Sequence, residues 1–126
     1  MTIPRLISDT RGATALEFGL TAPLFFALLA GLIECGLLFW TQVGLQHGAE
    51  MAARCASINT TLCGDAGAVK TYAIQQSLGL KPSTSDFTVT VESCGNHVSA
   101  NYTYQFLTSY FGAPGLTLNA LSCFPK

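Results

Sequence analysis

The chain has 126 residues, of which 49% are hydrophobic and 10% are charged, and its formal net charge is -1. This length provides one domain or less, which excludes a large enzyme. Neither half of the chain is strongly basic, so the sequence lacks the positive surface that a nucleic-acid-binding protein needs, and no nucleic-acid partner is expected. Most of the hydrophobic excess lies in one N-terminal run, and the remainder has the composition of a modest domain.

The chain begins with a short leader, MTIPRLISDTRG, that ends in Gly12. Arg5 and Arg11 outweigh Asp9 in the leader, whereas the chain after the apolar run carries equal numbers of basic and acidic groups. The positive-inside tendency therefore favours a cytoplasmic N-terminus.

The apolar run from Phe18 to Trp40 contains a single charged residue, Glu34. A helix of this length covers about 35 Å, against roughly 30 Å for the hydrocarbon core of a bilayer, so the run predicts a transmembrane helix. A secretory signal peptide would have a shorter apolar core and a small-residue cleavage site behind it, and no such site follows Trp40. We therefore expect the run to be retained, and any processing to occur before it, at Gly12.

Glu17 stands five residues after Gly12, at the start of the apolar run. Cleavage after Gly12 would leave an ammonium group on Ala13, and Glu17 could face that charge on a neighbouring subunit. The alternative is that Glu17 is an interfacial carboxylate favoured by the dipole at the helix N-terminus.

The residues from Gly12 to Phe18 resemble the prepilin peptidase site of type IV pilin-like proteins, in which cleavage follows the glycine and a glutamate stands fifth in the mature chain. Glu17-Phe18, Pro23, Glu34 and the alanine-rich stretch 46–56 follow in the order typical of the TadE-like pseudopilins of tight-adherence (Tad, Flp) pilus systems. The resemblance covers about the first 57 residues well and the remainder only in outline.

This resemblance implies a minor pilin-like structural protein that serves in assembly or initiation of a Tad pilus. A prepilin peptidase would cleave between Gly12 and Ala13, and Glu17, Phe18 and Glu34 would act in assembly. The implied partners are the peptidase, other pilin-like subunits, the pilus assembly platform and the lipid bilayer. The implied location is the inner (cytoplasmic) membrane, as a single-pass protein with a periplasmic C-terminal domain, or the extracellular pilus.

Glu34 and Pro23 are unusual within a membrane span. An ionised side chain costs about 2.5 to 3.5 kcal/mol at the bilayer centre and less toward an edge. Glu34 either extends to the periplasmic interface or contacts another pilin-like helix or the assembly platform. Pro23 cannot donate its amide, so we expect a kink between Gly19 and Pro23, although a tolerated transmembrane proline is common.

Small residues recur along the long helix at four-residue spacing, a pattern that lets another helix approach closely. The pattern equally fits a helix packed on its own domain, so it does not identify the neighbour. Cys35 is interpreted as a small membrane-facing filler and not as a ligand. The residues that we expect in helix packing are Ala27, Gly31, Cys35, Gly44 and Gly48.

After the span, residues 41–57 become amphipathic, which predicts one continuous helix from about Ala13 to Ser57. His47 is interpreted as a surface residue of this stalk. His97 is the other histidine, and no carboxylate or cysteine spacing around either histidine is typical of a metal site, so no metal or other cofactor is expected. The polar face of the stalk comprises Gln42, Gln46, Glu50 and Arg54, and the apolar face comprises Leu45, Ala49, Ala52 and Ala56.

The last part of the chain predicts a second helix and three strands. Asp65 can cap a helix running to about Leu78, ended by Gly79 and Pro82. Alternation predicts an antiparallel meander with one face on the stalk, a turn at 94–96 and strands at 87–92, 98–106 and 116–120. The expected buried residues of the second helix are Val69, Ala73, Ile74 and Leu78. The fold class is therefore α+β, with a long transmembrane and stalk helix and a small periplasmic domain.

Four of the five cysteines lie outside the membrane run, in an oxidising periplasm if the N-terminus is cytoplasmic. Two disulfides are expected. Three connectivities are possible, and geometry favours Cys55 with Cys63 and Cys94 with Cys123. The competing interpretation is four free, buried thiols.

The sequence thus divides into a prepilin-type leader at 1–12, a transmembrane and stalk helix at 13–57, and a small periplasmic domain at 58–126. An alternative function is a single-span, signal-anchored periplasmic binding or tethering domain that is not processed. An enzyme is not expected, because no Ser/His/Asp set, phosphate-binding glycine loop, metal-ligand spacing or reactive thiol emerges.

Overall fold

The computed structural model describes residues 11–107, 109, 112 and 114–126. Residues 1–10 of the expected leader lie outside the described residues. The chain forms two units, residues 1–35 and 36–126, which we describe separately. The described part of the first unit belongs to helix α1 (Arg11–Ile58), which continues without a break into the second unit. The prediction of one continuous helix from about Ala13 to Ser57 is confirmed.

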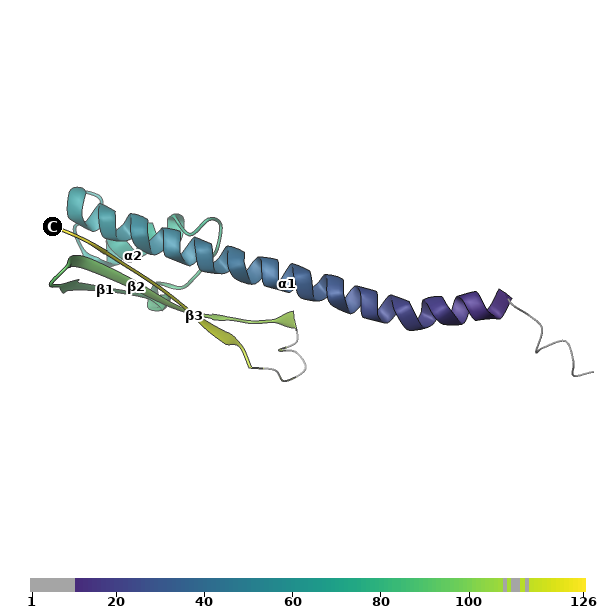
Figure 1. Cartoon of the computed structure of the whole chain (residues 1–126). Coiled ribbons are helices and arrows are strands. Elements are labelled where there is room, and N and C mark those ends of the chain that lie inside the picture. Colours follow the sequence, from purple (N-terminus) through teal and green to yellow (C-terminus); the bar gives the residue numbers. More distant parts are fainter. Residues whose placement is uncertain (1–10, 108, 110–111, 113) are drawn as a thin grey trace, which may run out of the picture. The chain divides into compact units, whose positions relative to one another are not determined.

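The second unit joins the C-terminal part of α1 to a small α+β assembly (Figure 1). The three strands form an antiparallel sheet in the order β1-β2-β3, which confirms the predicted meander. The remaining elements are α2 (Ala66–Gln75), a 3-10 helix η1 (Thr84–Asp86), β1 (Phe87–Glu92), β2 (Gly95–Tyr104) and β3 (Leu116–Phe124).

The β1–β2 turn is tighter than predicted. Glu92 pairs directly with Gly95, so the turn consists of Ser93 and Cys94 and not of residues 94–96. Gly95 has φ +126, and a Cβ on it would collide with the carbonyl oxygen of Phe124. The glycine therefore already belongs to β2, where it allows the end of β3 to approach.

One face of the sheet packs on α1, and this contact forms the core of the second unit. The helix contributes mainly alanines, which let the sheet come close to its backbone, while the sheet supplies the larger side chains. Phe87, Leu45 and Val98 are completely buried. The buried core residues of the two elements are Leu45, Ala49, Ala52 and Ala53 from α1 and Phe87, Val98, Ala100, Leu118 and Ala120 from the sheet.

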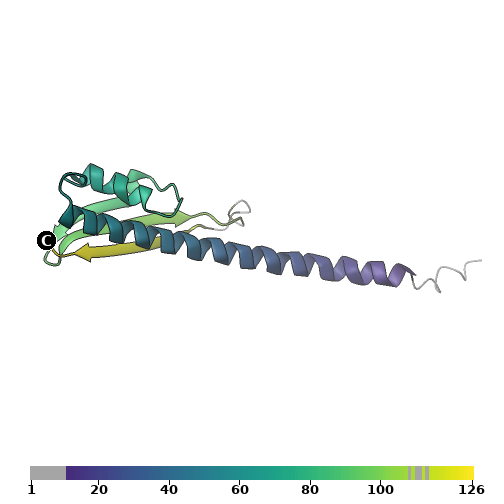
Figure 2. The ribbon, with the colours of Figure 1, turned by 90° about the horizontal axis from the view of Figure 1, so that it is seen from above.

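The edge strand β3 lies beside α1 (Figure 2). The side-chain amide of Gln42 donates to the carbonyl oxygen of Asn119 at 2.9 Å, and that of Gln46 donates to the carbonyl oxygen of Leu121 at 3.1 Å. These bonds satisfy backbone acceptors that an edge strand otherwise leaves to water or to another chain. Two residues of the predicted polar face thus hold the sheet on the helix.

Helix α2 ends earlier than predicted, at Gln75. Val69 and Ala73 are buried as expected and Ile74 is half-buried, but the prediction that Leu78 is buried is wrong, because Leu78 is 40% exposed. Leu78 and Gly79 both have positive φ, at 52° and 82°. The left-handed turn rotates Leu78 away from the buried side of α2.

Asp65 caps α2, as predicted, by accepting a hydrogen bond from the backbone N–H of Ala68 at 2.9 Å. Asp65→Ala is expected to lower the free energy of unfolding by about 1 kcal/mol, because that N–H loses its acceptor. Urea unfolding of the full chain in detergent micelles measures the change. Asp65→Asn keeps an accepting oxygen and is the matched control, so an equal loss in both variants would show that the cap does not cause it.

Candidate functional site: the apolar part of α1

Helix α1 exposes apolar side chains over its N-terminal half. Among the described residues, α1 is the one helix long and apolar enough to cross a membrane, and no part of its apolar window is buried. Such exposure is unfavourable in water, at roughly 25 cal/mol per Å², and is relieved in a bilayer. The large exposed residues of this surface are Leu16, Phe18, Leu20, Leu24, Phe25, Phe26, Leu28, Leu29, Leu32, Ile33, Leu37, Phe39 and Trp40. This helix fits a single-pass membrane protein.

The expected processing and assembly residues share the first turns of α1. Gly12, Ala13, Glu17 and Phe18 are all exposed. A Cβ added at Gly12 would meet no atom within 4 Å, so the position is open on the helix surface. The geometry leaves this stretch accessible to another protein, and its roles in processing and assembly stay predictions.

Pro23 lies within α1, and the helix continues past it. Its missing N–H leaves the carbonyl of Gly19 without the usual helical donor. Just before it, the Thr21 hydroxyl donates to the carbonyl oxygen of Glu17 at 2.9 Å, a bond that often accompanies bending of a helix. The kink stays a prediction.

The expected packing residues divide into two groups. In the first unit, Ala27, Gly31 and Cys35 are exposed, a Cβ on Gly31 would meet nothing within 4 Å, and Cys35 carries a free thiol. Glu34, in the same turn as Cys35, is half-buried. The small residues of the apolar part therefore remain open to another helix.

Gly44 and Gly48, by contrast, pack against their own chain. A Cβ on Gly44 would lie 2.6 Å from Leu80 Cδ1 and 2.9 Å from the Ser77 carbonyl oxygen. A Cβ on Gly48 would lie 2.7 Å from the Ala73 carbonyl oxygen and would collide with Ser77 Oγ. These glycines let α2 and the segment after it approach α1, so the neighbour that the sequence left open is here the chain's own domain.

Ser77 was missed by the sequence analysis. It is fully buried beside Gly48, and its hydroxyl donates to the Ala73 carbonyl oxygen at 2.7 Å. A serine just after a helix has no periodic signal of burial, so only the packing of α2 on α1 reveals its role.

His47 is half-buried, and its interpretation as a surface residue is wrong. Its Nδ1 lies 2.8 Å from the carbonyl oxygen of Gln76, the C-cap of α2. The acceptor is a carbonyl, so Nδ1 carries the proton and donates. The imidazole thus ties the end of α2 to α1.

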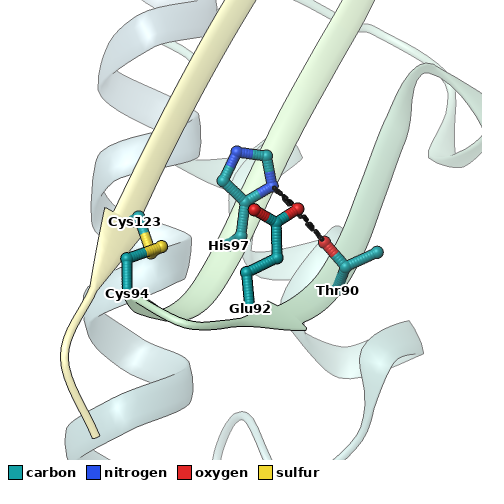
Figure 3. Close-up of polar contacts among 5 residues, drawn as sticks. All are labelled: Thr90, Glu92, Cys94, His97 and Cys123. Carbon is teal, nitrogen blue, oxygen red and sulfur yellow. Dashed lines mark hydrogen bonds and ion pairs between the residues drawn. A yellow bond between two sulfur atoms is a disulfide. The ribbon is translucent and has the colours of Figure 1, made fainter.

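His97 has a carboxylate beside it in the folded chain. Figure 3 shows Glu92 and Thr90 turned toward its ring, with Nδ1 3.5 Å from Glu92 Oε1 and 3.4 Å from Thr90 Oγ1. The tight turn causes this, because it pairs Thr90 with His97 and leaves Glu92 on the same face. Within the part of the chain that the structure describes, no three histidine, cysteine or acidic residues gather as metal ligands.

The two disulfides connect the cysteines as predicted. Cys55 bonds Cys63, with a Cα–Cα distance of 5.8 Å, and Cys94 bonds Cys123, with a Cα–Cα distance of 6.2 Å. The first closes the segment after α1, and the second, drawn in Figure 3, ties the β1–β2 turn to β3. The interpretation with four free thiols is wrong.

Comparison with known proteins finds a similarity over the N-terminal part of the chain. Residues 12–54 match the model of the family described as TadE-like protein. The matched residues contain the whole apolar part of α1 and most of the stalk. The match confirms the resemblance to TadE-like proteins of the Tad pilus system within the first 57 residues, where the sequence analysis found it. No curated protein and no solved structure matches the chain.

Proposed function

We propose that this chain, TadE-like over residues 12–54, is a minor pilin-like (pseudopilin) structural protein that serves in assembly or initiation of a Tad (Flp) pilus. The observation that carries the proposal is the unburied apolar surface of α1, which begins directly behind Gly12 and Glu17. A helix built in this way can be held in a bilayer and can offer its flank to similar helices.

Processing would prepare α1 for assembly. A prepilin peptidase cleaving after Gly12 leaves a free ammonium group on Ala13, one helical turn from the Glu17 carboxylate. Glu17 then pairs with the Ala13 ammonium of a neighbouring subunit, and the low dielectric at the membrane boundary strengthens that attraction. Gly31 and Ala27, further along the helix, have room for a close helix contact.

The rest of the chain would lie in the periplasm. The excess of basic residues in the leader favours a cytoplasmic N-terminus, and the two disulfides require an oxidising compartment. Both features support an orientation in the inner membrane with the N-terminus in the cytoplasm and the disulfide-bonded domain in the periplasm. The prepilin peptidase, the assembly platform and other pilin-like subunits are the proposed protein partners.

The mass of the mature protein tests the proposal. Co-expression with the cognate prepilin peptidase should remove residues 1–12 from the wild type, while Gly12→Val should keep the full mass because the site no longer presents a glycine to the protease. Gly19→Val is the matched control, since Gly19 is also a glycine of α1 with open surroundings, and it should be processed normally.

A wild-type chain that keeps its full mass beside an active peptidase would contradict the proposal. If that unprocessed chain still resists extraction from membranes by alkali, the second candidate, a signal-anchored periplasmic binding or tethering domain, would replace it. The exposed apolar helix fits both candidates equally, and processing separates them.

A further inference from the structure

The end of the sheet where β2 leads into β3 lies level with the first residues of the second unit, at about residue 36 of α1. Gln42 is bonded to Asn119 and Gln46 to Leu121, so four residues of helix, about 6 Å, run beside two residues of strand, about 7 Å. Continuing β3 back from Asn119 to Leu116, about 10 Å, reaches the level of about residue 36 on α1.

The chemistry of this end is that of a membrane interface. Leu107 is 68% exposed and Leu116 is 45% exposed, and Leu116 pairs with Tyr104 at the end of the ladder. The sequence contains no Asp, Glu, Lys or Arg between Ser93 and Pro125. Desolvation of a charge would therefore not oppose contact with lipid.

Helix α1 presents lipid-compatible residues at the same level. Leu37, Phe39 and Trp40 are each more than half exposed there. A hydrocarbon core of roughly 30 Å needs about 20 helical residues, which the run from Phe18 to Leu37 supplies. The headgroup region adds about 5 to 7 Å on each side, and the sheet end, level with about residue 36, lies at the boundary between the hydrocarbon core and the headgroup region.

We propose that Leu107 and Leu116, here called the sheet tip, insert into the outer interface of the phospholipid bilayer in which α1 is anchored. The occupant is lipid because the bonds from Gln42 and Gln46 place Leu116 level with about residue 36 of α1, next to the exposed Leu37, and because the sheet end carries no acidic or basic residue of the types Asp, Glu, Lys and Arg. The insertion gives the second unit a second point of attachment to the bilayer. The proposal rests on the proposed function in one respect, that α1 spans a membrane.

Tryptophan fluorescence in the full chain tests the sheet tip. Trp40 is the single tryptophan, so a Trp40→Phe background accepts one new tryptophan, either Leu107→Trp or the control Val91→Trp. Val91 is 64% exposed, close to the value of Leu107, but it lies beside the β1–β2 turn at the opposite end of the sheet. The proteins are reconstituted at low density into phosphatidylcholine vesicles with and without bromine-labelled acyl chains.

Bromolipid should quench the tryptophan fluorescence of Leu107→Trp at least about twice as strongly as that of Val91→Trp. Aqueous iodide should quench the fluorescence of Leu107→Trp less than that of Val91→Trp. Leu116→Trp provides an independent measurement should Leu107→Trp fail to fold. Equal bromolipid quenching of the tip and control tryptophans would overturn the inference, as would a tip tryptophan shielded from iodide but not quenched by lipid, which would indicate a protein contact.

The wild-type Trp40 separates this inference from the proposed function. Quenching of Trp40 by bromolipid with no difference between the tip and the control would leave the membrane anchor standing and reject only the inserted sheet tip. An unquenched Leu29→Trp in the Trp40→Phe background would show that α1 does not enter the bilayer, because residue 29 lies near the middle of the run from Phe18 to Leu37, and this result would reject both.

Discussion

Gly48→Ala is expected to lower the free energy of unfolding of the second unit by about 2 to 3 kcal/mol. Helix propensity alone predicts the opposite sign, a gain of up to about 1 kcal/mol for alanine over glycine inside a helix. Sterics decide the result, because the new methyl group would lie 2.7 Å from the Ala73 carbonyl oxygen and collide with Ser77 Oγ. Ser77 cannot move aside without cost, since it is fully buried and bonded to Ala73.

The matched control is Gly36→Ala, which makes the same chemical change in the same helix. A Cβ on Gly36 would meet nothing within 4 Å, so this variant should be neutral or gain up to about 1 kcal/mol. Urea unfolding in detergent micelles, followed by circular dichroism, compares the two. Equal effects at Gly36 and Gly48 would contradict the close approach of α2 to α1.

Removal of the Cys94–Cys123 disulfide is the second large effect that we expect. The bridge spans 29 residues, and its loss in the double variant Cys94→Ser with Cys123→Ser should lower the free energy of unfolding by about 3.6 kcal/mol. The Cys55–Cys63 bridge spans only 8 residues, so the corresponding double variant should lose about 2.6 kcal/mol. The difference arises because a longer loop restricts the unfolded chain more.

Unfolding by urea under non-reducing conditions measures both losses, and the order matters more than the absolute values. Cys35→Ser is the control, because Cys35 is exposed and carries no disulfide, and it should leave stability unchanged. A larger loss from the short bridge than from the long one would contradict the loop-entropy explanation and indicate that native contacts near Cys55 dominate.

The elements that could be predicted are those specified by local pattern. Continuous apolar and then amphipathic periodicity identified α1 within two residues at each end, and strict alternation identified three strands and their order. The disulfide pairing also followed, since a meander places Cys94 and Cys123 at one end of the sheet. The apolar part of α1 was recognisable because a membrane span needs only length and composition.

The details that were missed depend on contacts between segments far apart in sequence. Gln42 and Gln46 look like solvated residues of a polar face, yet they bond the edge of β3. His47 and Ser77 gain their roles only because α2 folds back on α1, and no local pattern encodes that contact. Leu78 fits the apolar period of α2, but a left-handed turn places it outside.

The sequence by itself determined the long apolar helix, the disulfide-bonded α+β domain and the resemblance of the N-terminal segment to TadE-like proteins. Hydropathy, alternation and cysteine spacing are patterns of residues near one another in the sequence, so they can be recognised without the structure. Only the tertiary structure decided which surfaces of the helix remain open. Gly48 packs against α2 and Gly44 against the segment after it, whereas Gly31 stays uncovered, although each of the three belongs to a series of small residues at four-residue spacing. Burial depends on which segments the fold brings against each residue, and that is fixed by the whole chain.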